Sequence, residues 1–133
     1  MTMMTSWGDS YPKIPGTFLQ VRPLTEATDA ATTLTAAQAI GGMITMTPTA
    51  ARTITLPTAA AILTLLQPGV QIGTSFLISI RNGAATSHSI TVAGPSGGGI
   101  TVDGLATIGP NTSGTFLARV TAEGTPAITF HRV

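Results

Sequence analysis

Short segments in which apolar and polar residues alternate recur along most of this protein. The alternation is clearest in segments 43–47, 52–56, 76–81, 89–92, 100–103, 115–120 and 127–130. A period of two is typical of a β-strand with one buried face. Turn residues, chiefly glycine and proline, separate the segments. The pattern therefore predicts an all-β fold, an antiparallel β-sandwich or jelly-roll-like domain, with no evident internal repeat.

One segment departs from the alternation. In 59–66 the apolar spacing is helical, and one face consists of Ala59, Ile62, Leu63 and Leu66. Pro57 suits the start of a helix, and Pro68 with Gly69 suits its end. We expect one short helix that covers an end of the sandwich. A helix that contacts a membrane or a partner is the alternative, because the segment has no charged face.

Residues 1–30 differ from the rest and are interpreted as an extended N-terminal arm. The arm contains Trp7, Tyr11 and Phe18, three prolines, and one possible short strand at 18–21. Proline at this density favours extended backbone over helix. Such an arm is either a terminus without a role or a docking element. The three aromatic side chains favour docking, because aromatic anchors are typical of buried contacts. Residues 31–133 then form the sandwich domain.

The composition narrows the classes of function. Only 8% of the residues are charged, while 25 of the 133 are threonine. So few charges exclude a basic face that would hold nucleic acid. The absence of cysteine excludes disulfides and thiolate metal sites. The longest apolar stretch, 59–66, is too short to span a membrane, and the first ten residues do not resemble a secretory signal. Threonine is β-branched and suits the outer face of strands, so a weakly charged surface buried in an oligomer is expected.

Few residues are candidates for chemistry. Ser87, His88, Ser89 and Asp103 allow a Ser-His-Asp site in principle, but no nucleophile turn or oxyanion loop accompanies them. The glycine-rich loop Gly94–Gly99 lacks the lysine and hydroxyl of a phosphate-binding loop. The acidic residues do not have the spacing of a known metal-binding motif. If the protein forms a trimer, a cluster of acidic residues around the trimer axis is the alternative. We therefore expect no enzyme activity, no cofactor and no metal.

Two leucines and four arginines point to contacts between subunits. Leu77 and Leu117 occupy the outward phase of their strands, where threonine would be expected, so we interpret them as a candidate subunit interface. Isolated exposed leucines are the alternative reading. The arginines near strand ends are expected to pair with carboxylates or with neighbouring subunits; these are Arg52, Arg81, Arg119 and Arg132.

The order of motifs over residues 31–133 resembles a group of phage structural proteins. It runs through Leu34-Thr35, Gly41–Ile44, Thr53–Ala60, Gly73–Phe76, Ile80–Asn82, Ile90–Val92 and Thr112–Leu117. These motifs are similar to those of virion decoration (cement) and head-fibre proteins with a trimeric jelly-roll-like β domain. The resemblance implies a homotrimer on the capsid surface of a virion, made in the host cytoplasm.

The resemblance also implies partners. The major capsid protein would receive the arm, other copies of the protein would complete the trimer, and neither nucleic acid nor a membrane is expected as a partner. The particle would be stabilised mechanically. The alternative is a tail-fibre or head-fibre domain that binds a receptor or glycan through loops such as Gly94–Gly99 and Gly109–Gly114.

Overall fold

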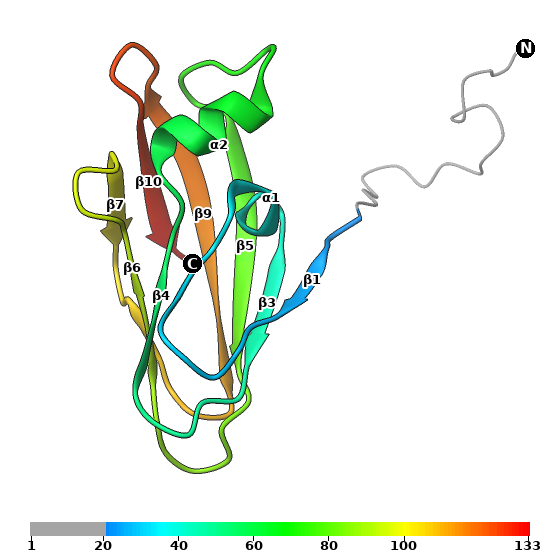
Figure 1. Cartoon of the computed structure of the whole chain (residues 1–133). Helices are drawn as coiled ribbons and strands as arrows, with labels where there is room; N and C mark the ends of the chain where they lie inside the picture. The colour runs from blue at the N-terminus through cyan, green and yellow to red at the C-terminus, as the bar shows by residue number, and fades with distance from the viewer. Residues whose placement is uncertain (1–20) are drawn as a thin grey trace, which may run out of the picture.

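The computed structural model describes residues 21–133, and within them ten strands form two facing sheets with two short helices at one end (Figure 1). The six-stranded sheet has the order β1-β3-β5-β9-β10-β7, and the four-stranded sheet has the order β2-β4-β6-β8. The elements are β1 (Leu24–Glu26), β2 (Thr32–Thr33), α1 (Ala36–Ala39), β3 (Met43–Met46), β4 (Arg52–Thr55), α2 (Ala59–Leu66), β5 (Ser75–Asn82), β6 (Ile90–Ala93), β7 (Ile100–Asp103), β8 (Thr107–Ile108), β9 (Thr112–Ala122) and β10 (Ala127–Arg132).

The prediction of an antiparallel sandwich is wrong, because both sheets are mixed. β1, β3 and β5 are parallel neighbours in one sheet, and β2, β4 and β6 are parallel neighbours in the other. Antiparallel pairing joins β5 to β9, β9 to β10 and β6 to β8. The backbone passes to the opposite sheet after each of the first eight strands. Up to β6, a strand that returns to its sheet after such a crossover runs parallel to the strand before it, whereas β8 returns antiparallel to β6.

A repeated unit underlies the parallel half of the fold. The unit comprises a strand of the four-stranded sheet, a helix, and a strand of the six-stranded sheet; it occurs as β2-α1-β3 and again as β4-α2-β5. Each helix begins at a threonine cap. The hydroxyl of Thr35 accepts from the amide of Gln38, and the hydroxyl of Thr58 accepts from the amide of Ala61. This repeat is not evident in the sequence, because the two helices differ in length.

The single predicted helix is present as α2 with the expected bounds, and α1 was missed. A helix of four residues is too short to show a period, but a capping box marks its start. The side chain of Gln38 accepts from the backbone amide of Thr35, while the hydroxyl of Thr35 accepts in return from the amide of Gln38. A Thr followed three residues later by Gln is the sequence signal of this motif.

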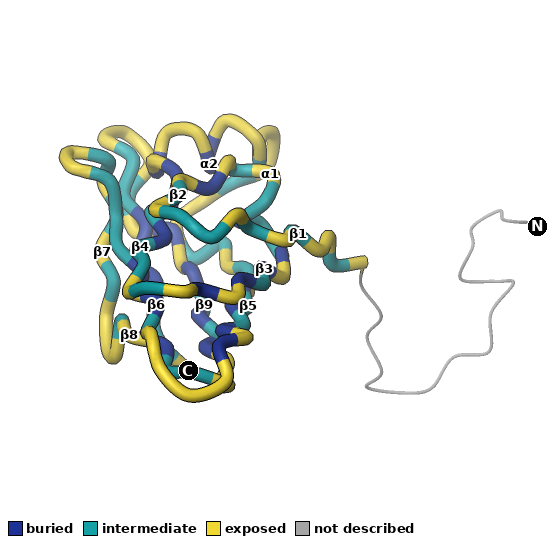
Figure 2. Tube along the Cα trace, turned by 60° about the horizontal axis from the view of Figure 1, so that its bottom comes forward, coloured by how far each residue is buried: buried dark blue, intermediate teal, exposed yellow. Residues whose placement is uncertain are grey.

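The core lies between the two sheets and is closed at one end by the helices (Figure 2). Alternate strand residues point into it, and α2 adds Ala59, Ile62 and Leu63. The largest side chains with essentially no exposure are Phe116, Phe130, Ile44, Met46, Ile54, Leu56, Ile62, Ile78, Ile80, Ile90, Ile108 and Ile128. Alternating threonines such as Thr45, Thr91 and Thr101 are half-buried or exposed, as their outward phase predicted.

Residues 21–30, the last part of the predicted arm, belong to the folded unit. β1 pairs in parallel with β3 and forms one edge of the six-stranded sheet. A few residues later Asp29 forms an ion pair with Arg52 of β4. The boundary at residue 30 therefore lies inside the fold. Trp7, Tyr11 and Phe18 lie outside the described residues.

Candidate functional site

The outer face of the six-stranded sheet carries several exposed apolar side chains. Leu24 is 59% exposed, Met43 40% and Leu77 39%, and Leu117 is half-buried among them. Leu24 and Met43 are register partners in neighbouring strands, so they form one apolar pair. Leu77 and Leu117 are register partners in β5 and β9 and form a second pair. We call the four residues Leu24, Met43, Leu77 and Leu117 the open-face patch.

The second pair continues into a polar row. The register partner of Leu117 on β10 is His131, whose partner on β7 is Asp103. The Nδ1 atom of His131 lies 3.0 Å from Oδ2 of Asp103. Both side chains are well exposed, and an exposed pair of this kind adds little to stability. Along one line across β5, β9, β10 and β7, the outer face therefore changes from two leucines to a polar pair.

Polar groups between the two apolar pairs bond to one another. Arg22 donates to the carbonyl oxygens of Gly41 and Gly42 at 2.9 and 2.8 Å, and to the hydroxyl of Ser79 at 3.2 Å. Ser79 also lies 3.1 Å from the hydroxyl of Thr115. Nε and Nη2 of Arg22 and the hydroxyls of Ser79 and Thr115 therefore keep hydrogen-bond partners when the face is covered.

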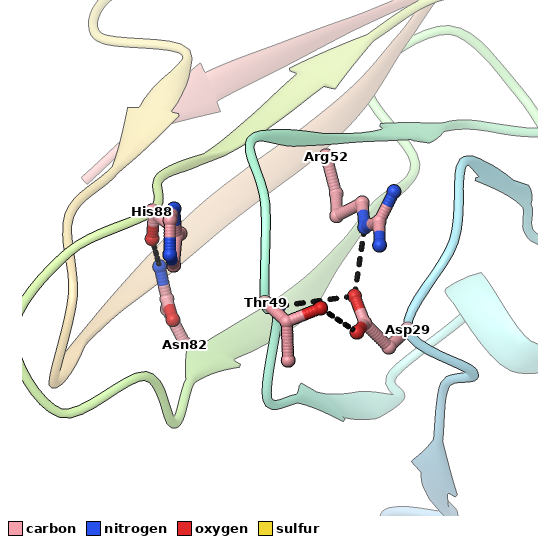
Figure 3. Close-up of polar contacts among 5 residues, drawn as sticks. All are labelled: Asp29, Thr49, Arg52, Asn82 and His88. Atoms are coloured by element: carbon pink, nitrogen blue, oxygen red, sulfur yellow. Dashed lines mark hydrogen bonds and ion pairs between the residues drawn. The ribbon is translucent and has the colours of Figure 1, made fainter.

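The residues considered for catalysis do not converge. Asp103 bonds to His131, on the outer face of the six-stranded sheet. His88 instead lies in the crossover from β5 to β6, where its carbonyl oxygen accepts from Asn82 (Figure 3). Within residues 21–133, no three His, Asp or Glu side chains are grouped as metal ligands.

The end of the molecule opposite the helices holds a second polar cluster (Figure 3). Asp29, from the crossover between β1 and β2, accepts from Nε of Arg52 at 2.7 Å, from the hydroxyl of Thr49 at 2.5 Å and from the amide of Thr49 at 3.2 Å. The Arg52 guanidinium, followed by the two Thr49 donors, holds the pKa of the Asp29 carboxyl well below its usual range. The cluster ties successive crossovers together, and its local bonds indicate a structural role.

The predicted pairing of arginines with carboxylates holds for one of the four residues. Arg52 pairs with Asp29, whereas Arg81 donates to the side-chain oxygen of Asn111. Arg132 donates to the carbonyl oxygens of Leu105 and Thr107 and lies over the ring of Phe116. No carboxylate partner is found for Arg81, Arg119 or Arg132 among residues 21–133.

Two further features bear on ligand binding. The loop Gly94–Gly99 closes on the start of α2, where the carbonyl of Gly98 accepts from the amide of Ala59 at 2.8 Å. A backbone carbonyl of the loop therefore satisfies the first amide of α2. A separate polar hollow of about 160 Å³ lies where β1, β2 and α1 meet, and Thr25, Glu26, Thr32 and Gln38 are among its lining residues. The aromatic platforms typical of many ligand sites are missing from its lining.

Comparisons of the sequence and structure with protein-family models, curated proteins and solved structures found no match. No helix in the described part of the protein is long and apolar enough to cross a membrane. The open-face patch is therefore the feature on which a functional interpretation can be built.

Proposed function

We propose that this protein is a structural protein of a virion, a decoration or cement protein that assembles as a homotrimer and binds the major capsid protein lattice. The observation that carries the proposal is the Leu77–Leu117 pair, two leucines side by side on the outer face of the six-stranded sheet. Exposed apolar side chains that lie together on one face are typical of an interaction site. The resemblance to virion decoration proteins indicates the partner, the major capsid protein.

The surroundings of the pair favour burial against protein. Leu24 and Met43 extend the apolar area, and Arg22 between the two pairs already has three acceptors within the fold. Only 8% of all residues are charged, so little charge must be desolvated when copies assemble. Each apolar contact contributes about 25 cal/mol per Å² buried, before the cost of association. Repetition over a capsid lattice adds the gains of many copies.

The N-terminal segment is the proposed attachment to the particle. Trp7, Tyr11 and Phe18 supply the anchors in this interpretation, and β1 connects them directly to the edge of the six-stranded sheet. The role is mechanical: the arm holds the domain at a junction between capsid subunits, and the domain adds contacts there. The protein would act on the outside of the capsid, after synthesis in the host cytoplasm.

Mass spectrometry of purified particles tests the proposal. The expected result is the protein at a fixed copy number relative to the major capsid protein. Its absence from particles of a virus that encodes it would overturn the proposal. Clear hits on a glycan array, together with a location on the fibre, would instead favour the receptor-binding alternative.

A truncation then tests the arm. Deleting residues 1–20 keeps Arg22, β1 and the Asp29–Arg52 ion pair, so the domain is expected to keep its fold and oligomeric state but to lose particle binding. The triple substitution of Trp7, Tyr11 and Phe18 by alanine should reproduce the loss without shortening the protein. Undiminished binding by both variants would rule out the arm as the attachment.

A further inference from the structure

Asn82 is the only fully buried polar side chain in the described part of the protein, with 0% of its surface exposed. It ends β5, at the point where the backbone passes from the six-stranded sheet to the other. Its Nδ2 donates to the carbonyl oxygens of His88 at 2.9 Å and Ile108 at 3.0 Å, and its Oδ1 accepts from the amide of Ala84 at 2.9 Å (Figure 3 shows the bond to His88). The nitrogen and the oxygen of the Asn82 side chain thus join the end of β5 to the crossover that follows it and to β8.

The next residue, Gly83, lies in a crowded position. A Cβ atom at this position would lie 2.7 Å from the hydroxyl oxygen of Thr47. The amide of Gly83 donates to the carbonyl oxygen of Met46 at 2.8 Å, which ties the crossover to the end of β3. The packing therefore favours asparagine at position 82 through its three hydrogen bonds, and a small residue at position 83.

In a flexible polypeptide this pair of residues is chemically labile. The backbone nitrogen of the glycine attacks Cγ of the asparagine and forms a new bond from nitrogen to carbon. The bond between Cγ and Nδ2 breaks, and Nδ2 leaves as ammonia with the proton that the glycine amide gives up. Water then opens the resulting cyclic imide to aspartate or isoaspartate. Glycine permits the reaction because no Cβ hinders the approach, and asparagine is in general a thermolabile residue.

In the folded protein both reacting groups are engaged. The attacking nitrogen carries the proton that Met46 accepts, and the carboxamide is held by its bonds to His88, Ala84 and Ile108. Attack on Cγ requires both sets of bonds to break. We propose that Asn82 is a deamidation site controlled by folding, protected in the native state and modified when the crossover end of the molecule opens.

The product is incompatible with the native packing. Aspartate at position 82 would place carboxyl oxygens against the carbonyl oxygens of His88 and Ile108, which now receive Nδ2 protons. Buried acceptors facing one another without a proton are costly. Isoaspartate inserts an extra backbone atom between Cα of residue 82 and Gly83, which displaces the Gly83 amide from the carbonyl oxygen of Met46 that it now bonds. Opening followed by deamidation is therefore irreversible, and this inference is independent of the proposed virion role.

The test compares deamidation in native buffer and in denaturant at the same mildly alkaline pH. Peptide mapping by mass spectrometry separates asparagine, aspartate and isoaspartate at position 82. We expect Asn82 to react at least about tenfold more slowly in the native protein, because reaction waits for opening. The other asparagine, Asn111, precedes threonine and serves as the control within the same molecule. Equal rates at Asn82 in the two conditions would overturn the proposal.

A second measurement tests the irreversible step. A sample held in denaturant until about half of Asn82 has reacted is returned to native buffer beside a freshly denatured sample. The native fraction, separated by size-exclusion chromatography, should contain unmodified Asn82, with the deamidated molecules left in the misfolded fraction. Recovery of deamidated molecules in the native fraction, with unchanged thermal stability, would contradict the proposed incompatibility.

Discussion

Leu77 and Leu117 lie directly opposite each other on neighbouring antiparallel strands, on the outer face of the six-stranded sheet. A cross-strand apolar pair contributes only about 0.2–1 kcal/mol to the fold itself. The pair is therefore of small value to an isolated subunit and of larger value to an assembly that covers it. The two contributions can be separated by experiment.

Replacing both leucines by threonine should dissociate the proposed homotrimer and leave the fold intact. Threonine is β-branched and suits a strand, and it removes most of the apolar surface of the leucine side chain. We expect light scattering after chromatography to show a monomer, with the free energy of unfolding changed by about 1 kcal/mol or less. Leu105→Thr is the matched control, because Leu105 is 64% exposed but lies outside both sheets. A double variant with the assembly mass of the wild type would exclude this face as the interface.

Asp29→Asn should weaken the protein at neutral pH and remove part of its sensitivity to acid. The bonds from Arg52 and Thr49 lower the pKa of Asp29 in the folded state relative to the unfolded state. A carboxyl with a lowered folded pKa stabilises the fold above its unfolded pKa, about 4, and that stabilisation is lost as the pH falls further. Wild type and variant should therefore differ at pH 7 and converge as the pH falls.

Chemical denaturation at several pH values measures this effect. Glu123→Gln removes one carboxylate without disturbing the Asp29 cluster and is the control for the loss of a negative charge. A difference between Asp29→Asn and wild type that stays constant from neutral pH to well below the unfolded pKa of about 4 would show that the carboxylate charge does not contribute.

The local structure was largely predictable, whereas the pairing of strands was not. Alternation predicts that Ile54, Ile78 and Phe116 are buried, because every second side chain of a strand lies on the same face. The same alternation does not say whether the next strand is a hairpin partner or lies in the opposite sheet. That choice is made by contacts between residues far apart in the sequence; the hydrogen bond of Asp29 with Thr49, which joins two crossovers, is one such contact.

The candidate site shows the same division. The outward phase of Leu77 and Leu117 could be predicted from each strand separately, but their direct opposition depends on the register of β5 with β9. Leu24 and Met43 were missed, because Leu24 fell within the segment interpreted as an arm. Asn82 follows the alternating segment 76–81, whose pattern does not reveal its burial, because the burial depends on β8, which brings the carbonyl of Ile108 against it.

Thr58→Ala should destabilise the protein by about 1 kcal/mol, the usual cost of losing an N-cap hydroxyl. The hydroxyl of Thr58 accepts from the amide of Ala61, which no helical carbonyl can serve. Thr64→Ala is the control within the same helix, because its hydroxyl donates to the carbonyl of Ala60, which also belongs to the helix ladder. Thermal unfolding compares the two. Equal destabilisation by both substitutions would mean that the cap contributes nothing specific.

Gly99→Ala should be more destabilising than Gly97→Ala, although both glycines have positive φ, +74° and +66°. A left-handed backbone costs a residue with a Cβ about 1–2 kcal/mol, and this cost is common to both variants. At Gly97 the new Cβ has nothing within 4 Å, whereas at Gly99 it would clash with the carbonyl oxygen of Pro126. That oxygen belongs to the backbone that leads into β10, and the amide of Ile128 bonds to Gly99 itself. The loop and the strand must therefore separate, which adds about 1–3 kcal/mol. Urea denaturation of the two variants measures the difference, and equal unfolding free energies would show that the loop yields without strain.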